Sequence, residues 1–170
     1  DIPIIVGGNH ASTFKGLIIK RFKYIDYVLI GEGEYTFPKL LECVIERKGT
    51  GIEKIDGLAY RKGGHLGNGY DPLTGNIHTP ADQIIVQEKL RYIGNLAELP
   101  HANFDVVDVK SYYMDTSKWY NPHGISIGQP FPIISSRCCP MRCTFCNMWH
   151  VHGPKIRDRT AVDVVDEIEN

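Results

Sequence analysis

The chain has 170 residues, a formal net charge of -1, and 42% hydrophobic and 23% charged residues. These values are ordinary for globular domains and exclude disordered, fibrous and membrane-embedded classes. The near-zero charge leaves no electrostatic footprint for nucleic acid or an anionic membrane, and the apolar runs are too short for a membrane span.

Two short apolar runs, over residues 2–6 and 27–30, are the first predicted elements. Continuous β-branched and aromatic residues of this length indicate strands buried on both faces in a parallel sheet. Each run ends in glycine, at Gly7-Gly8 and at Gly31-Glu32-Gly33-Glu34. The glycines predict a tight turn at the end of each strand.

A helical pattern follows each glycine turn, over residues 12–21 and 37–47, and Gly49 can cap the second helix. Strand, glycine turn and helix in this repeated order predict the second half of a doubly wound α/β domain, over residues 1–50.

The middle of the chain, residues 51–129, reads as a hairpin and a linker. Residues 57–62 have a strand pattern, and a glycine-rich, turn-rich stretch follows them. Residues 79–129 are interrupted by prolines and predict one short helix, near residues 105–113.

The last segment begins with a strand pattern over residues 131–135 and ends with a helix. Thr160 and Asp163 fit a capping box at the start of that helix. Its apolar residues fall on one face at helical spacing, namely Ala161, Val164, Val165 and Ile168. Four cysteines lie between this strand and this helix, at an edge where α/β folds bind ligands.

The cysteines are unevenly placed, with Cys43 alone and the other four within nine residues. An odd number crowded into one loop is a poor disulfide framework and favours metal or redox chemistry in a reducing cytosol. We therefore expect a cytoplasmic protein.

The spacing of Cys139, Cys143 and Cys146 is C-x3-C-x2-C, with Phe145 before the last cysteine. Three thiolates on one short loop can hold three corners of an iron–sulfur cubane and leave the fourth iron open. A zinc site that also uses Cys138 or His150, or a Cys143–Cys146 redox pair, are the alternatives for the same residues.

This motif after a strand resembles the radical S-adenosylmethionine (SAM) superfamily. The resemblance implies that Cys139, Cys143 and Cys146 ligate a [4Fe–4S] cluster and that Phe145 lies by the adenine of SAM. It also implies that residues 130–170 form the first βα unit of a partial TIM barrel. In that family the cluster cleaves SAM reductively to a 5′-deoxyadenosyl radical, which abstracts hydrogen from substrate.

Cys138 departs from the family pattern, because glycine usually occupies this position. If the backbone there has a positive φ, a cysteine side chain is strained. The departure concerns the geometry of the loop and leaves the ligand set unchanged.

The glycine turns resemble the cobalamin (B12)-binding radical SAM family, in which a Rossmann-like domain precedes the barrel. The resemblance extends to Gly57-Leu58-Ala59-Tyr60-Arg61 in the connector and to Arg157-Asp158-Arg159-Thr160 after the cysteines. It implies that residues 1–50 are the C-terminal half of that domain. Cobalamin then contacts Gly7 and Gly8, with His10 and Glu32 as further contacts.

Members of this family methylate unactivated carbons or rearrange rings and lipids. The resemblance therefore implies a small-molecule or lipid substrate and an external electron donor, a flavodoxin or ferredoxin. A cobalamin-free enzyme similar to methylthiotransferases and a non-catalytic zinc or thiol binding module are the alternatives. The chain begins without Met inside a strand pattern, so we expect a fragment of a longer protein, inactive by itself.

Overall fold

A computed structural model of the chain describes residues 2–46, 49–62, 70–71, 76–77, 83–112, 123 and 132–169. The chain divides into two compact units. Unit 1 comprises Asp1–Gly94 and Cys138–Ile156, and unit 2 comprises Asn95–Arg137 and Arg157–Asn170. In these described parts, no helix is both long enough and apolar enough to cross a bilayer.

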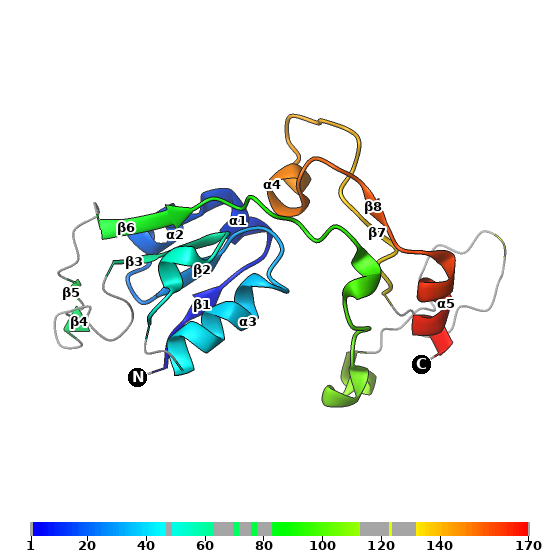
Figure 1. Ribbon diagram of the computed structural model, residues 1–170, viewed down its shortest axis with the longest axis horizontal. Coiled ribbons are helices and arrows are strands. Elements are labelled where there is room, and N and C mark those ends of the chain that lie inside the picture. The colour runs from blue at the N-terminus through cyan, green and yellow to red at the C-terminus, as the bar shows by residue number, and fades with distance from the viewer. Residues whose placement is uncertain are drawn as a thin grey trace. The chain divides into compact units, whose positions relative to one another are not determined.

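Unit 1 contains a four-stranded sheet with the order β1-β2-β3-β6 (Figure 1). Its strands are β1 (Ile5–Val6), β2 (Tyr27–Leu29), β3 (Leu58–Arg61) and β6 (Ile84–Gln87). The first two strands are parallel, as the sequence predicted, whereas β3 is antiparallel to both β2 and β6. The sheet is therefore mixed. A separate two-stranded ladder pairs β4 (Tyr70–Asp71) with β5 (Asn76–Ile77).

The helix predicted over residues 12–21 is two short helices, α1 (Asn9–Phe14) and α2 (Gly16–Arg21). The break falls at Lys15, whose φ of 48° lies outside the helical region. A residue with this backbone cannot continue a right-handed helix, so α2 starts in a new direction.

The second predicted helix is confirmed as α3 (Thr36–Leu41), which continues as a π-helical turn over Glu42–Glu46. Gly49 ends it as expected: its φ is 88°, and its N–H donates to the Cys43 carbonyl at 2.7 Å. This is the left-handed cap geometry that glycine adopts without steric cost.

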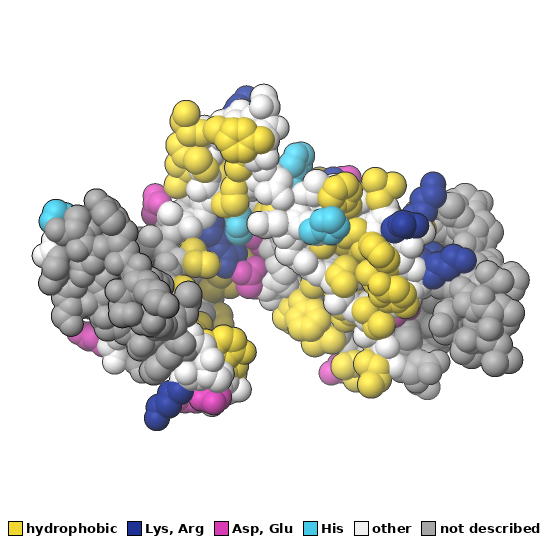
Figure 2. Space-filling view, turned by 180° about the vertical axis from the view of Figure 1, so that it is seen from behind, with side chains coloured by type: hydrophobic (Ala, Val, Ile, Leu, Met, Phe, Trp, Pro, Cys, Tyr) yellow, Lys and Arg dark blue, Asp and Glu magenta, His cyan; other side chains and the backbone are white. Residues whose placement is uncertain are grey.

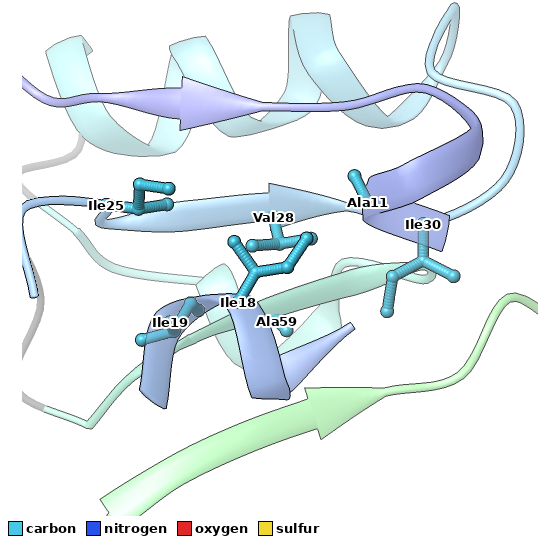
Figure 3. Packing of buried hydrophobic residues seen from close by; sticks show 7 residues of the cluster. All are labelled: Ala11, Ile18, Ile19, Ile25, Val28, Ile30 and Ala59. Atoms are coloured by element: carbon cyan, nitrogen blue, oxygen red, sulfur yellow. The ribbon is translucent and has the colours of Figure 1, made fainter. Parts of the chain in front are cut away.

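Both faces of the sheet are covered. Val28 and Ala59 point to the face that carries α1 and α2, where the first core cluster lies (Figure 3). Tyr27 and Leu58 point to the other face and pack against Leu40 of α3. Because side chains alternate along a strand, this arrangement requires β2 to be apolar at every position, and all three of its residues are buried.

In the described residues of unit 2, a small ladder is followed by a longer helix. β7 (Ser136–Arg137) pairs antiparallel with β8 (Arg157–Asp158), and α5 (Ala161–Glu169) follows β8. The strand expected over residues 131–135 is wrong in position, because residues 132–135 are irregular and β7 begins at Ser136. The short helix expected near residues 105–113 is two 3-10 turns, Phe104–Val106 and Val109–Tyr112, after a first such turn at Leu96–Glu98.

Two leucines of unit 1 differ sharply in burial and provide a test of this core. Leu40 is fully buried, whereas Leu90 is 80% exposed. We expect Leu40→Ala to lower the free energy of unfolding by about 2–5 kcal/mol, because it leaves a cavity, and Leu90→Ala to change it by less than about 0.5 kcal/mol. Urea unfolding followed by circular dichroism measures both, and equal losses would contradict the assigned core.

Candidate functional site

The two glycine turns lie at the same edge of the sheet, because β1 and β2 are parallel and neighbouring. Ser12 of α1 joins them: its hydroxyl donates to the Gly8 carbonyl at 2.9 Å and accepts from the Gly31 N–H at 2.9 Å. Ser12 is fully buried, so both hydrogen bonds form away from water. The sequence offered no signal for this role of Ser12.

The first glycine turn is open to a ligand. A Cβ added at Gly8 would meet nothing within 4 Å, and one added at Gly7 would only touch Leu29, at 3.6 Å. His10 is exposed nearby and stacks on Phe14, with ring centroids 4.6 Å apart. The absence of a covering side chain over these glycines, among the residues described, fits the close approach of a bulky group.

Glu32 of the second turn is placed differently from His10. It is 3% exposed, and its carboxylate accepts from the Ile93 N–H at 2.9 Å and contacts His152 Nδ1 at 3.3 Å. The structure thus brings Gly7, Gly8 and His10 to an open turn but buries Glu32 inside unit 1.

The cysteine loop runs from Cys138 to the start of α4 (Met148–His152). Cys143 is exposed, Cys139 and Cys146 are half-buried, and all are free thiols. The Cys146 N–H donates to the Cys143 carbonyl at 3.0 Å, which closes a tight turn between these two cysteines. Phe145 lies in this turn and is 91% exposed. Hydrophobic side chains also gather elsewhere on the surface of the molecule (Figure 2).

No three His, Cys, Asp or Glu side chains among the described residues stand close enough together to hold a metal ion. The structure therefore places Cys139, Cys143 and Cys146 on one loop but does not gather their sulfurs around one point. The chemistry of the donor set still fits an iron–sulfur cluster, since three free thiols at this spacing are its typical ligands.

Cys138, at the position where the family pattern has glycine, has a positive φ of 74°. This backbone is unfavourable for a side chain by about 1 kcal/mol relative to glycine. Its thiol donates to the Gly153 carbonyl at 2.8 Å, which offsets part of that cost and ties the start of the loop to the end of α4.

Arg142, inside the loop, lies over the indole ring of Trp149 in α4, with its guanidinium carbon 4.3 Å from the ring centroid. A cation over an indole face is attracted by the ring quadrupole. The contact ties the middle of the loop to α4, and no pattern in the sequence pairs these two residues.

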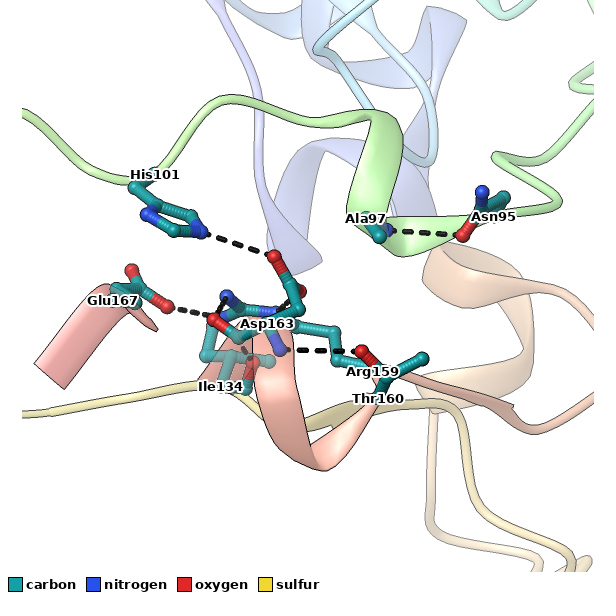
Figure 4. A network of polar contacts seen from close by, with 8 residues as sticks. All are labelled: Asn95, Ala97, His101, Ile134, Arg159, Thr160, Asp163 and Glu167. Carbon is teal, nitrogen blue, oxygen red and sulfur yellow. Dashed lines mark hydrogen bonds and ion pairs between the residues drawn. The ribbon is translucent and has the colours of Figure 1, made fainter. Parts of the chain in front are cut away.

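A polar network in unit 2 organises the start of α5 (Figure 4). Arg159 pairs with Asp163 and Glu167 and donates to the Ile134 carbonyl at 3.1 Å, while Asp163 also contacts His101 Nε2 at 3.0 Å. The hydrogen bond from Arg159 is the main cause that lowers the pKa of both carboxyls, and His101 lowers that of Asp163 further.

The predicted N-cap at Thr160 is confirmed, because its hydroxyl accepts from the Asp163 N–H at 3.2 Å. In a full capping box the N3 carboxylate would accept from the N–H of the N-cap residue. The carboxylate of Asp163 contacts Arg159 and His101 instead. α5 therefore begins at a cap and a charge network together.

The network predicts how the stability of unit 2 depends on pH. Since the pKa of Asp163 is lowered below its usual 3.8, its stabilising effect is complete above that value and is lost as pH falls through the folded-state pKa. We expect Asp163→Asn to lower the melting temperature by a few degrees near neutral pH. The difference from wild type should stay constant from about pH 7 down to about pH 4 and shrink only as pH falls below 3.8. Thermal unfolding followed by circular dichroism measures it, with Glu169→Gln, at an exposed position of the same helix, as control.

No family model matches the chain. It is 26% identical over 99% of its length to an uncharacterized methyltransferase of Pyrococcus horikoshii. It is also 27% identical over 96% of its length to the cytidylyl-2-hydroxyethylphosphonate methyltransferase of Streptomyces wedmorensis. A third relative, the hopanoid C-3 methylase of Methylococcus capsulatus, is 25% identical over 95% of the chain.

The chain covers 30% of the first two of these relatives and 25% of the third. Both glycine turns and the cysteine loop fall within the length that aligns, since nearly the whole chain does. The chain is therefore a distant relative of part of several methyltransferases and methylases.

Proposed function

We propose that this chain is part of a radical SAM enzyme in which Cys139, Cys143 and Cys146 hold three irons of a [4Fe–4S] cluster. The observation that carries this is the loop itself, with three free thiols at C-x3-C-x2-C spacing, two of them on one turn. The distant relation to methyltransferases over the whole chain supports an enzyme of this class.

Each residue of the loop has a separate task in this proposal. The three thiolates bind iron and leave the fourth iron open to SAM. Phe145, which is almost fully exposed, offers a ring face to the adenine. A bound cluster supplies one-electron reduction of SAM, which is the chemistry that starts catalysis in this superfamily. Arg142 and Cys138 hold the loop against α4 and its end.

Cobalamin is the second proposed cofactor, at the open turn of Gly7 and Gly8 with His10 beside it. The relatives named as methyltransferases and a methylase favour methyl transfer as the outcome. The bare surface over Gly8 supports a bulky ligand there. We propose that residues 1–50 are the C-terminal half of the cobalamin domain and residues 51–129 the connection.

The activity, substrate and partners belong to the whole protein, because the chain spans less than a third of its relatives. We propose a small-molecule or lipid substrate and a flavodoxin or ferredoxin as electron donor. In this proposal residues 130–170 supply only the first βα unit of a barrel, and such a barrel needs further units to enclose a radical.

The metal content of cysteine variants tests the cluster. After anaerobic reconstitution of the whole protein we expect about four irons with labile sulfide, because a cubane holds four. Alanine at Cys139, Cys143 or Cys146 should abolish SAM cleavage and lower bound iron. Cys138→Gly should retain both, since glycine suits a φ of 74°. Stoichiometric zinc without sulfide would instead support the non-catalytic binding module.

Cobalamin binding tests the glycine turn. Gly7 lacks the positive φ of Gly8, so Gly7→Leu adds bulk to the turn without backbone strain. We expect it to lower cobalamin affinity at least about tenfold while iron content is unchanged, because a side chain there blocks close approach. Gly94→Leu is the matched control, at a glycine with open space and no positive φ.

Titration of the whole protein followed by visible absorption measures this binding. If the folded wild-type protein binds no cobalamin at saturation, the enzyme belongs with cobalamin-free relatives similar to methylthiotransferases. The cluster proposal would then still stand, because it depends on different residues.

A further inference from the structure

The carboxylate of Glu32 is buried, and the structure gives it two separate partners. Its side chain is 1% exposed, one oxygen accepts from the Ile93 N–H, and the other contacts His152. An ionised group in such a position is costly unless its oxygens are paired. The Ile93 and His152 contacts are therefore required by the burial of Glu32.

His152 ends α4, and both ends of this helix are tied to the glycine-turn side of unit 1. At its start, Asn147 Nδ2 donates to the Asn9 carbonyl at 3.3 Å and to Thr13 Oγ1 at 3.0 Å. At its end, Gly153 packs so closely on Tyr92 that an added Cβ would lie 2.8 Å from the ring. Within the helix, Val151 is buried.

The same short segment, residues 147–153, also holds the cysteine loop. Trp149 supports Arg142 in the middle of the loop, and the Gly153 carbonyl accepts from Cys138 at its start. The segment therefore touches α1 through Asn147, the second glycine turn through His152, and the cysteine loop through Trp149 and Gly153. All these contacts lie within unit 1.

We propose that Glu32 is a positioning residue that acts through His152. Its buried carboxylate fixes residues 147–153, and this segment fixes the loop that carries Cys139, Cys143 and Cys146. The second glycine turn thus serves as the support of the cysteine loop, while the first is left open for a ligand. The proposal takes the loop to bind the cluster of the proposed function, although the contacts themselves need no cluster.

This role differs from a direct cobalamin contact for Glu32. A ligand contact needs an accessible oxygen, whereas both oxygens of Glu32 have protein partners and the residue is buried. The two roles therefore predict different consequences for the same substitution.

Hydrogen exchange of the cluster-free chain, read by mass spectrometry, tests the support directly. We expect Glu32→Ala to speed exchange of residues 147–153 at least about tenfold, since a buried hydrogen bond to a charged group is lost. Peptides over residues 138–146 should also exchange faster, whereas those over α3 should not. Glu46→Ala, at an exposed position of unit 1, is the matched control.

Two further variants separate positioning from mere folding. Glu32→Gln keeps an acceptor for Ile93 and a partner for His152, so it should restore most of the protection. His152→Ala should reproduce the faster exchange of residues 147–153. The double variant Glu32→Ala/His152→Ala should be little worse than Glu32→Ala alone, because the two residues act as one contact.

The reconstituted whole protein supplies a second readout. We expect Glu32→Ala to lose iron to a chelator several-fold faster than wild type, with cobalamin affinity unchanged. Unchanged exchange at residues 147–153 together with weaker cobalamin binding would overturn the proposal in favour of a ligand contact. Faster exchange throughout unit 1 that Glu32→Gln does not restore would overturn the proposal, because Glu32 would then only be required for folding. If the wild type binds no cluster, the proposed function fails, but the exchange result still decides the contact.

Discussion

The parallel pairing of β1 with β2 is the constraint on which the arrangement of unit 1 depends. Because the two strands run in the same direction, their carboxyl ends and both glycine turns meet at one edge. The buried hydroxyl of Ser12 then joins the turns by one donated and one accepted hydrogen bond. The open turn and the turn that holds Glu32 are thereby kept side by side, and the α4 segment contacts the second turn and the helix that follows the first.

Local patterns in the sequence predicted the elements of this unit better than their pairing. The apolar runs and glycines located β1, β2, α3 and the cap at Gly49, since each depends on residues close in the chain. The direction of β3 and the existence of β6 depend on partners far away, such as Ala59 opposite Val86. Periodicity within a short strand contains no information about such a partner.

In the candidate site, too, features that depend on neighbouring residues could be recognised in the sequence, whereas those that depend on distant partners could not. The spacing drew attention to Cys139, Cys143 and Cys146, and the departure from the family pattern drew attention to Cys138, because both signals are properties of neighbouring residues. The supporting contacts could not be predicted, because Glu32 and His152 are 120 positions apart and Arg142 meets Trp149 only once α4 has formed. The residues proposed to perform chemistry were visible in the sequence, whereas the contacts around them required the structure.

Several residues proposed to bind cofactors are exposed, whereas residues that support them are buried. Cys143 and Phe145 lie at the surface, where a cluster and an adenine could reach them, and the turn at Gly8 is likewise uncovered. Glu32, Val151 and Ser12, which support these parts, are buried. A site that takes up large cofactors must leave its binding groups accessible, so its rigidity has to come from residues behind them. A buried carboxylate suits that task, because the cost of leaving it unpaired opposes any movement of its partners.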